Sequence, residues 1–175
     1  MTTYVALLRG INVGGRRGVA MADLEAVVAD AGGERVTTYI QSGNVVFGHR
    51  SRSAAKLGAQ LEQAIEAAVG FPVPVMLRSA PEWEAVVAAN PYPGVEPTTL
   101  HVAFLGGDPA PGAADSVDRD AFAPEEFEIV GRQVYMHLPN GMGRSKLPQA
   151  LEIIGIPATV RNWRTVTKLA ELATG

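Results

Sequence analysis

Three short segments place positively charged side chains next to glycines or to an expected helix start. They are 9–18 (RGINVGGRRG), 141–147 (GMGRSKL) and 159–169 (TVRNWRTVTKL). The N-terminus of a helix carries partial positive charge and favours anions over cations. One such start would mean little, but three in one chain indicate a shared negatively charged partner. The planar guanidinium group of arginine suits phosphate or carboxylate.

The chemistry that these segments could perform is therefore anion binding. A glycine loop before a helix can direct backbone N–H groups at a phosphate, which makes Gly14 and Gly15 candidate donors. Segment 9–18 matches neither the Walker loop nor a clean G-x-G-x-x-G pattern, so an ordinary strand-to-helix turn is its alternative. The cations expected to converge on one anion are Arg9, Arg144, Lys146, Arg161 and Arg164.

Neutral polar residues stand in the segment TYIQSGN (38–44), at the expected tip of a hairpin. Gln41, Ser42 and Asn44 are side chains of the kind that orient a bound polar group. The same residue types also form turns, which is the alternative interpretation.

Groups suited to acid–base catalysis are scarce near these segments. The basic stretch 132–168 holds only Glu152 as a carboxylate, and His49, His101 and His137 lack metal-ligand spacing. General acid–base chemistry and magnesium binding both need carboxylates or histidine close by. The sequence thus favours binding over catalysis and predicts neither metal nor cofactor.

Two other functions stay open. The first is an enzyme that acts on a phosphorylated or nucleotide-like substrate through electrostatic stabilisation alone. The second is single-stranded nucleic-acid binding on a sheet, for which Tyr39 and Phe47 would have to be exposed for stacking. A net charge of −3 disfavours a general nucleic-acid binder.

Composition narrows the class of protein. The chain has 175 residues, of which 47% are hydrophobic, and no cysteine, which excludes disulfides, zinc–thiolate sites and thiol nucleophiles. Residues 79–131 carry one arginine and ten acids, whereas residues 132–168 carry six cations and one acid. The basic C-terminal third leaves a local anion site open. With no signal peptide and no apolar run approaching membrane-spanning length, we expect a cytoplasmic protein without membrane contact.

The elements that must position these side chains are predicted from periodicity and turn residues. A strand at 4–10, a helix at 20–32, a hairpin at 35–48, a helix at 53–69 and a strand at 73–78 are predicted. The order β-α-β-β-α-β is that of a ferredoxin-like unit. A linking helix is predicted within 81–91, with Pro81 in its first turn.

The second half repeats part of this pattern. "VALLRG" at 5–10 matches "VAFLGG" at 102–107 in four of six positions. A hairpin at 126–139 and helices at 145–154 and 162–173 come after it, while 107–124 is predicted to be a surface excursion. We expect an α+β fold with two tandem ferredoxin-like (βαββαβ) halves, the second irregular. The predicted segments are 1–78, a link at 79–97, and 98–175, with the anion site between the halves.

Six motifs in combination extend this interpretation. "ALLRGINVGG", "TYIQSGNVVF", "NPY", "HVAFL", "YMHLPNGMGRSKL" and "RNWRTVTKL" together resemble the bacterial domain-of-unknown-function family 1697, from Tyr4 to about Leu172. The resemblance implies a pair of ferredoxin-like halves and carries over no catalytic residue. It also implies that certain polar positions belong to shared motifs, namely Arg9, Asn12, Gln41, Ser42, Asn44, Asn140, Arg144, Lys146, Arg161, Asn162 and Arg164.

Overall fold

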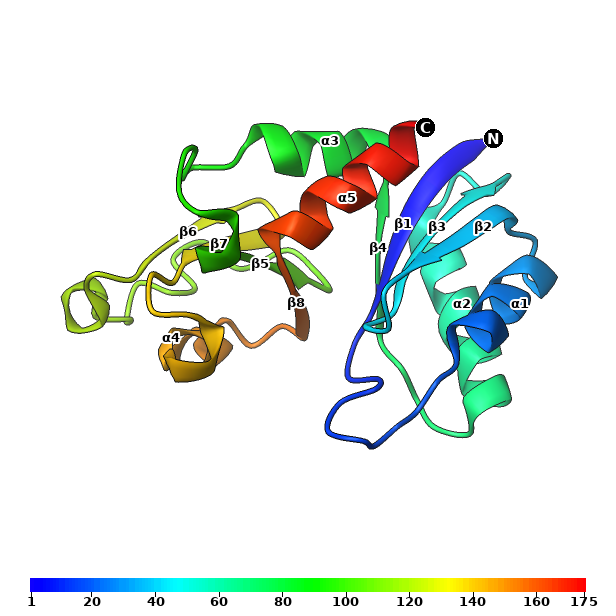
Figure 1. The fold of residues 1–175 in the computed structure, drawn as a ribbon, viewed down its shortest axis with the longest axis horizontal. Coiled ribbons are helices and arrows are strands. Elements are labelled where there is room, and N and C mark those ends of the chain that lie inside the picture. Colours follow the sequence, from blue (N-terminus) through cyan, green and yellow to red (C-terminus); the bar gives the residue numbers. More distant parts are fainter. The chain divides into compact units, whose positions relative to one another are not determined.

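Two antiparallel four-stranded sheets organise the chain in the computed structural model, which describes all residues 1–175 (Figure 1). One sheet belongs to unit 1, formed by Met1–Ala85 and Lys168–Gly175, and the other to unit 2, formed by Val86–Thr167. The mixed α+β class expected from the sequence is confirmed. No helix is long and apolar enough to cross a membrane.

Unit 1 has the predicted order, and each predicted element lies within a few residues of its expected place. Its strands are hydrogen-bonded in the order β2-β3-β1-β4. Helices α1 and α2 pack on the same side of the sheet (Figure 1). The elements are β1 (Thr2–Leu8), α1 (Met21–Asp30), β2 (Glu34–Tyr39), β3 (Asn44–His49), α2 (Ala54–Val69), β4 (Val75–Ser79) and α3 (Ala80–Ala88).

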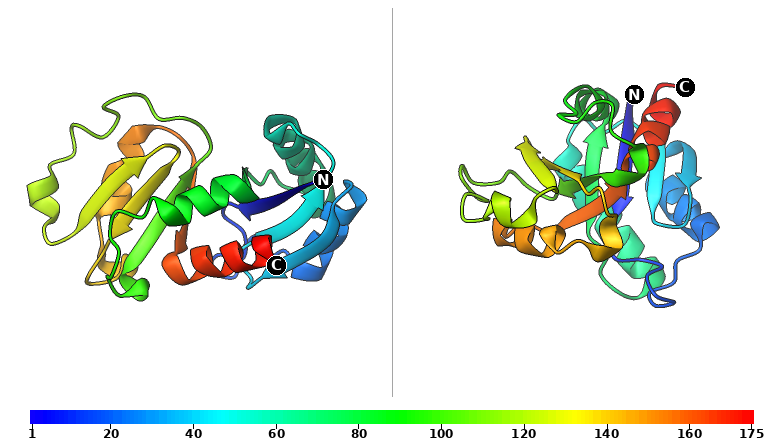
Figure 2. Two further views of the ribbon diagram at one scale, coloured as in Figure 1. Left: turned by 90° about the horizontal axis from the view of Figure 1, so that it is seen from above. Right: turned by 60° about the vertical axis from the view of Figure 1, so that its left-hand side comes forward.

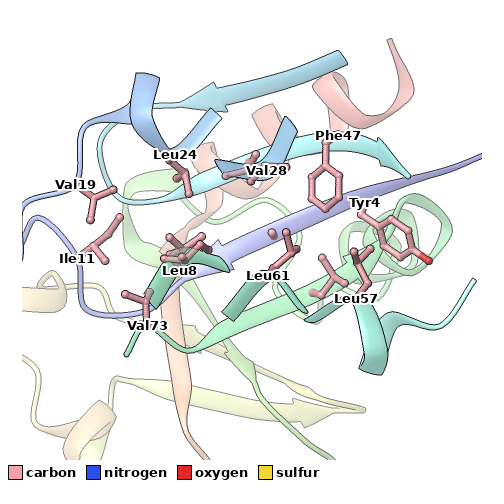
Figure 3. Close-up of a cluster of buried hydrophobic side chains, with 14 residues drawn as sticks. Tyr4, Leu8, Ile11, Val19, Leu24, Val28, Phe47, Leu57, Leu61 and Val73 are labelled. Atoms are coloured by element: carbon pink, nitrogen blue, oxygen red, sulfur yellow. The ribbon is translucent and has the colours of Figure 1, made fainter. Parts of the chain in front are cut away.

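The core of unit 1 explains why these residues form these elements. Alternate side chains of β1 enter the core, and α2 adds Leu57, Leu61 and Ile65 at a spacing of four residues (Figure 3). Helix α2 begins where the Ser53 hydroxyl accepts a hydrogen bond from the Lys56 N–H, at 3.3 Å. It ends at Gly70, whose φ of 85° is the left-handed conformation typical of a helix C-terminus.

Unit 2 has the strand order β6-β7-β5-β8. Helical structure in it is short, and between β5 and β6 the chain runs outside the sheet with a single 3₁₀ turn at Arg119–Phe122 (Figure 2). The predicted surface excursion is therefore confirmed. The elements are β5 (Leu100–Leu105), β6 (Glu126–Val130), β7 (Gln133–His137), α4 (Leu147–Ala150) and β8 (Ala158–Asn162). Helix α5 (Trp163–Thr174) begins in unit 2 and, from Lys168 on, belongs to unit 1.

Unit 2 differs from the prediction in two places. The stretch expected to be helical at 145–154 is helical over 147–154, but as the short α4 followed by a 3₁₀ turn at Leu151–Ile154, which ends at Gly155 with φ 76°. Strand β8 is absent from the predicted elements. It forms because residues 158–162 pair with β5, and its last residue, Asn162, accepts a hydrogen bond from the Thr165 N–H at 2.9 Å and so caps α5.

Candidate functional site

Three connections meet at one end of the sheet in unit 1. They are Arg9–Gly18, which we call the basic loop, the β2–β3 turn at 40–43 and the α2–β4 connection at 70–74. The Leu8 N–H donates to the Gly43 carbonyl at 2.8 Å, and the Arg9 N–H donates to the Pro74 carbonyl at 3.0 Å. These two hydrogen bonds fix the base of the basic loop against both neighbours.

Asn12 fixes the middle of the basic loop. Its Nδ2 donates to the carbonyls of Val19 at 3.0 Å and Gln41 at 2.6 Å, while its Oδ1 accepts from the Val19 N–H at 2.8 Å. Its φ of 52° lies in the left-handed region, which asparagine tolerates better than most residues. Because both Nδ2 hydrogens are used by backbone carbonyls, we assign Asn12 to holding the loop rather than to contacting a ligand.

The tip of the basic loop is a tight turn. The Arg16 N–H donates to the Val13 carbonyl at 3.0 Å, and the Asn12 N–H donates to the Arg17 carbonyl at 3.1 Å. Gly14 and Gly15, with φ of 57° and 73°, make the left-handed conformations of this turn possible. Neither glycine N–H donates a hydrogen bond within the chain, so both stay open to a bound anion.

The charge of the basic loop comes from three exposed arginines. Arg9 and Arg16 form no ion pair and no side-chain hydrogen bond. The guanidinium of Arg17 donates to the Pro72 carbonyl and lies 4.6 Å from the centroid of the Phe71 ring, which holds it in place without neutralising it. The loop itself contains no carboxylate.

The polar residues of the β2–β3 turn have different roles. Asn44 is fully buried, and its Nδ2 donates to the Tyr39 carbonyl at 3.0 Å and to the Ser42 hydroxyl at 2.9 Å. Asn44 and Ser42 therefore shape the turn. Gln41 is exposed, and the hydrogen bond from Asn12 uses its backbone carbonyl, so its side chain can reach a ligand.

The predicted cations of unit 2 are not alike either. Asn140, Arg144 and Lys146 lie on the segment before α4, where Arg144 is exposed, and Arg164 is exposed on α5. Arg161 is only 7% exposed and lies in β8, where it donates to the Thr159 hydroxyl at 2.7 Å and to the Val160 carbonyl at 3.0 Å. Burial lowers the pKa of the Arg161 guanidinium to about 10.

The expected grouping of cations at helix starts is wrong for α1; at α5 the cations stand where expected along the chain, but one of them, Arg161, is buried. Helix α1 begins at Met21, beyond the basic loop, and the charged residue of its first turn is Asp23. Arg161 belongs to a strand, which leaves Arg164 in the first turn of α5.

Groups that could perform acid–base chemistry are not gathered near the basic loop. No three His, Asp or Glu side chains lie close enough together to hold a metal ion. His101 lies in β5, where burial lowers its pKa although a hydrogen bond with the Thr99 backbone opposes the shift. Phe47, a stacking residue in the nucleic-acid alternative, is 1% exposed and packs in the core beside Tyr4, so it cannot stack on a base.

Sequence reasoning missed two hollows. One, of about 470 Å³, lies between α1 and α2 and is lined mostly by small and apolar residues. The other, of about 750 Å³, lies in unit 2 under the excursion 109–120 and is acidic. There Arg119 lies 4.0 Å from the centroid of the Phe127 ring and pairs with Glu128 at 3.7 Å. Only the clustering of small residues could have suggested the first hollow.

Comparison with known proteins places the chain in a family. A solved structure of a conserved bacterial protein, SP0830 from Streptococcus pneumoniae, has a TM-score of 0.79 and 24% sequence identity, and the match covers 100% of this chain and 99% of that one. This likeness shows the fold alone. No curated protein matches the chain.

The family described as "Protein of unknown function (DUF1697)" matches residues 1–135. The matched part includes the basic loop and the β2–β3 turn, whereas the motifs from Asn140 to Arg164 lie beyond it. This match confirms the resemblance drawn from the sequence motifs. The chain belongs to the DUF1697 family.

Proposed function

We propose that the basic loop of unit 1 binds a small ligand that carries a phosphate or carboxylate group. The observation that carries the proposal is the set of three exposed arginines, Arg9, Arg16 and Arg17, with no carboxylate partner. Three like charges within nine residues repel one another, and a bound anion relieves that repulsion. Arginine can also form two parallel hydrogen bonds with such a group.

The fixed backbone of the basic loop supports a binding site rather than an ordinary turn whose arginines are only exposed to solvent. Asn12 and the two hydrogen bonds at the loop base hold the backbone before any ligand arrives. A preorganised site loses less conformational entropy on binding than a flexible one. The open N–H groups of Gly14 and Gly15 and the exposed Gln41 side chain add uncharged donors. No group suited to proton transfer lies on this loop, so the proposal is one of binding.

The test is calorimetric titration with inorganic phosphate and pyrophosphate. A hydrogen bond to a charged group contributes about 1.5–3 kcal/mol, so losing two should weaken binding by at least about 100-fold. We expect that loss in the double variant Arg9→Gln/Arg16→Gln. The matched control is Arg52→Gln, which removes an exposed arginine from the β3–α2 connection. Equal affinities in the double variant and the control would overturn the proposal, as would an absence of heat with both anions.

We also infer that the two units are copies of one ferredoxin-like unit. Counting strands within each unit, both sheets have the order 2-3-1-4. The two backbone hydrogen bonds at the base of the basic loop have counterparts in unit 2. There the Leu105 N–H donates to the Arg132 carbonyl and the Gly106 N–H donates to the Pro157 carbonyl, both at 2.8 Å.

The strand registers support the same inference. Val5 pairs with Arg78 in unit 1, and Val102 pairs with Arg161 in unit 2. Both arginines are buried, and each donates to the carbonyl of the residue before it at 3.0 Å. In unit 2 the first helix of the pattern is replaced by a 3₁₀ turn, which makes this copy the less regular one.

A further inference from the structure

The hollow between α1 and α2 begins where the basic loop ends. Its volume of about 470 Å³ lies within the usual range of small-molecule pockets. Buried residues form its floor, and small exposed residues, among them Ala26 and Ala68, leave it open to solvent. We call it the interhelix groove. Its apolar lining residues are Val19, Leu24, Val27, Ile65, Ala68 and Val69.

The interhelix groove is continuous with the basic loop along the chain. Gly18 closes the basic loop and also lines the groove, and Val19, which is hydrogen-bonded to Asn12, comes next. On the α2 side, Val69 lines the groove. Two residues further along the chain is Phe71, whose ring contacts the Arg17 guanidinium. Arg17 does not line the groove itself, but it precedes one lining residue, Gly18, and contacts Phe71 shortly after another, Val69, so its positive charge adjoins the loop end of the groove along the chain.

One lining residue of the groove is charged. Asp23, in the first turn of α1, is exposed beside the apolar residues. Its carboxylate repels an anion inside the groove, while the arginines attract one at the basic loop. The two ends of the site thus favour different parts of one ligand. The anionic group belongs at the loop and an uncharged apolar part belongs between the helices.

We propose that the ligand of the basic loop is a soluble single-chain amphiphile, in which a phosphate or carboxylate is joined to an apolar chain that lies in the interhelix groove. The proposal rests on the proposed anion binding and goes beyond it by naming the ligand class. Its two supports are the charge of the basic loop and the side chains that line the groove, which apart from Asp23 carry no polar group.

The experiment is a chain-length series measured by calorimetry at concentrations below micelle formation. The probes are inorganic phosphate and methyl, butyl, hexyl and octyl phosphate. A fully buried methylene strengthens binding about fourfold, so a partly open groove should give about two- to fourfold per methylene. Ala68→Leu fills the groove, and we expect it to flatten the series while leaving the affinity for inorganic phosphate unchanged.

The matched control is Ala67→Leu, the same substitution at the neighbouring exposed position of α2, which does not line the groove. It should keep the full dependence on chain length. Circular dichroism checks that each variant is folded. If Ala68→Leu fails to fold, Ala26→Leu fills the groove from α1 instead.

The outcomes separate the two proposals. Binding of inorganic phosphate with a flat chain-length series in the unsubstituted protein overturns the amphiphile and leaves anion binding standing. An identical rising series in Ala68→Leu and Ala67→Leu also overturns it, because the chain would lie elsewhere. Binding to vesicles of anionic lipid without binding to any soluble alkyl phosphate overturns it in favour of a membrane surface. No binding of any phosphate overturns anion binding itself.

Discussion

Replacing Asn12 by glycine should loosen the basic loop without straining its backbone. Glycine accepts the φ of 52° at this position, so the substitution removes only the side chain and its three hydrogen bonds. Two of these bonds join Asn12 to Val19, and one joins it to Gln41 across 29 positions of the chain. The loop would then lose its attachment both to the start of α1 and to the β2–β3 turn.

The size of the effect depends on the bonds lost. Each contributes about 0.5–1.5 kcal/mol net, and with one of the three exposed to solvent the sum is about 2 kcal/mol. Asn12→Ala should cost about 1 kcal/mol more, because alanine has a Cβ that disfavours the left-handed conformation. If the free energy of unfolding of the whole protein falls by this 2 kcal/mol, Asn12→Gly lowers Tm by about 4–8 °C.

The most direct assay is hydrogen exchange at the Val19 amide, whose N–H donates to the Asn12 Oδ1. A loss of about 2 kcal/mol corresponds to roughly 30-fold faster exchange through local opening. Asn12→Asp is the internal control, since its carboxylate still accepts from the Val19 N–H but cannot donate to the carbonyls of Val19 and Gln41. We expect near-normal protection of that amide in Asn12→Asp. Unchanged exchange at Val19 in Asn12→Gly, together with an unchanged Tm, would refute the assignment.

Two further predictions concern a glycine and two tyrosines. Gly43→Ala should lower the free energy of unfolding in a denaturant titration by about 2–4 kcal/mol, because the φ of Gly43 is 82° and a Cβ would stand 2.7 Å from a β1 side chain. The control is Gly10→Ala, where φ is 72° but no atom stands near the added Cβ. It should show only the smaller cost of the backbone conformation in the same titration. Burial, reinforced at Tyr92 by neighbouring glutamates, raises the pKa of Tyr92 and Tyr135 to about 12. A raised pKa favours the protonated folded state, so this stability is intact below pH 10 and is lost as the pH rises towards 12. Absorbance at alkaline pH should show two late-ionising tyrosines, and Tyr92→Phe and Tyr135→Phe should each remove one; ionisation of both at their ordinary pH would contradict it.

Unit 1 could be predicted from the sequence because its local signals agree with its packing. Helix α2 shows this most clearly. Ser53 caps it, its core residues recur every four positions, and Gly70 ends it. The β2–β3 hairpin likewise forms around a Ser-Gly turn, at the point where two strand-forming runs meet. Signals of this kind act over a few residues, so a single sequence contains them.

Strand β8 could not be predicted in the same way, because its formation depends on a distant partner. Residues 158–162 precede a strongly amphipathic helix, and their short run resembles the helix start that was expected there. Pairing with β5, more than 50 residues earlier, makes them a strand. Arg161 is consequently buried and does not reach solvent beside Arg164. The role of that arginine is therefore decided by tertiary structure.

The candidate site was foreseen by residue type but not by role. The sequence marked Asn12 and Asn44 as polar positions of shared motifs, and both hold backbone carbonyls in the structure. An asparagine that satisfies a turn and one that contacts a ligand have the same letter in a sequence. Of the three arginines of the basic loop, only Arg9 was predicted as a site residue, and Arg16 and Arg17 join it because they too are exposed and have no carboxylate partner.

The duplication that we infer explains why we propose an anion site on the connection after the first strand of unit 1 and not on the matching connection of unit 2. Both units hold the end of their first strand by the same pair of backbone hydrogen bonds, so the framework is common to them. The segments beyond that strand differ in charge: the basic loop carries three arginines, whereas the excursion at 107–124 carries four aspartates and one arginine. A phosphate would be repelled where those aspartates stand. Because a surface connection can change its charge without disturbing the sheet that holds it, the two copies can keep one fold while only one of them presents a site for an anion.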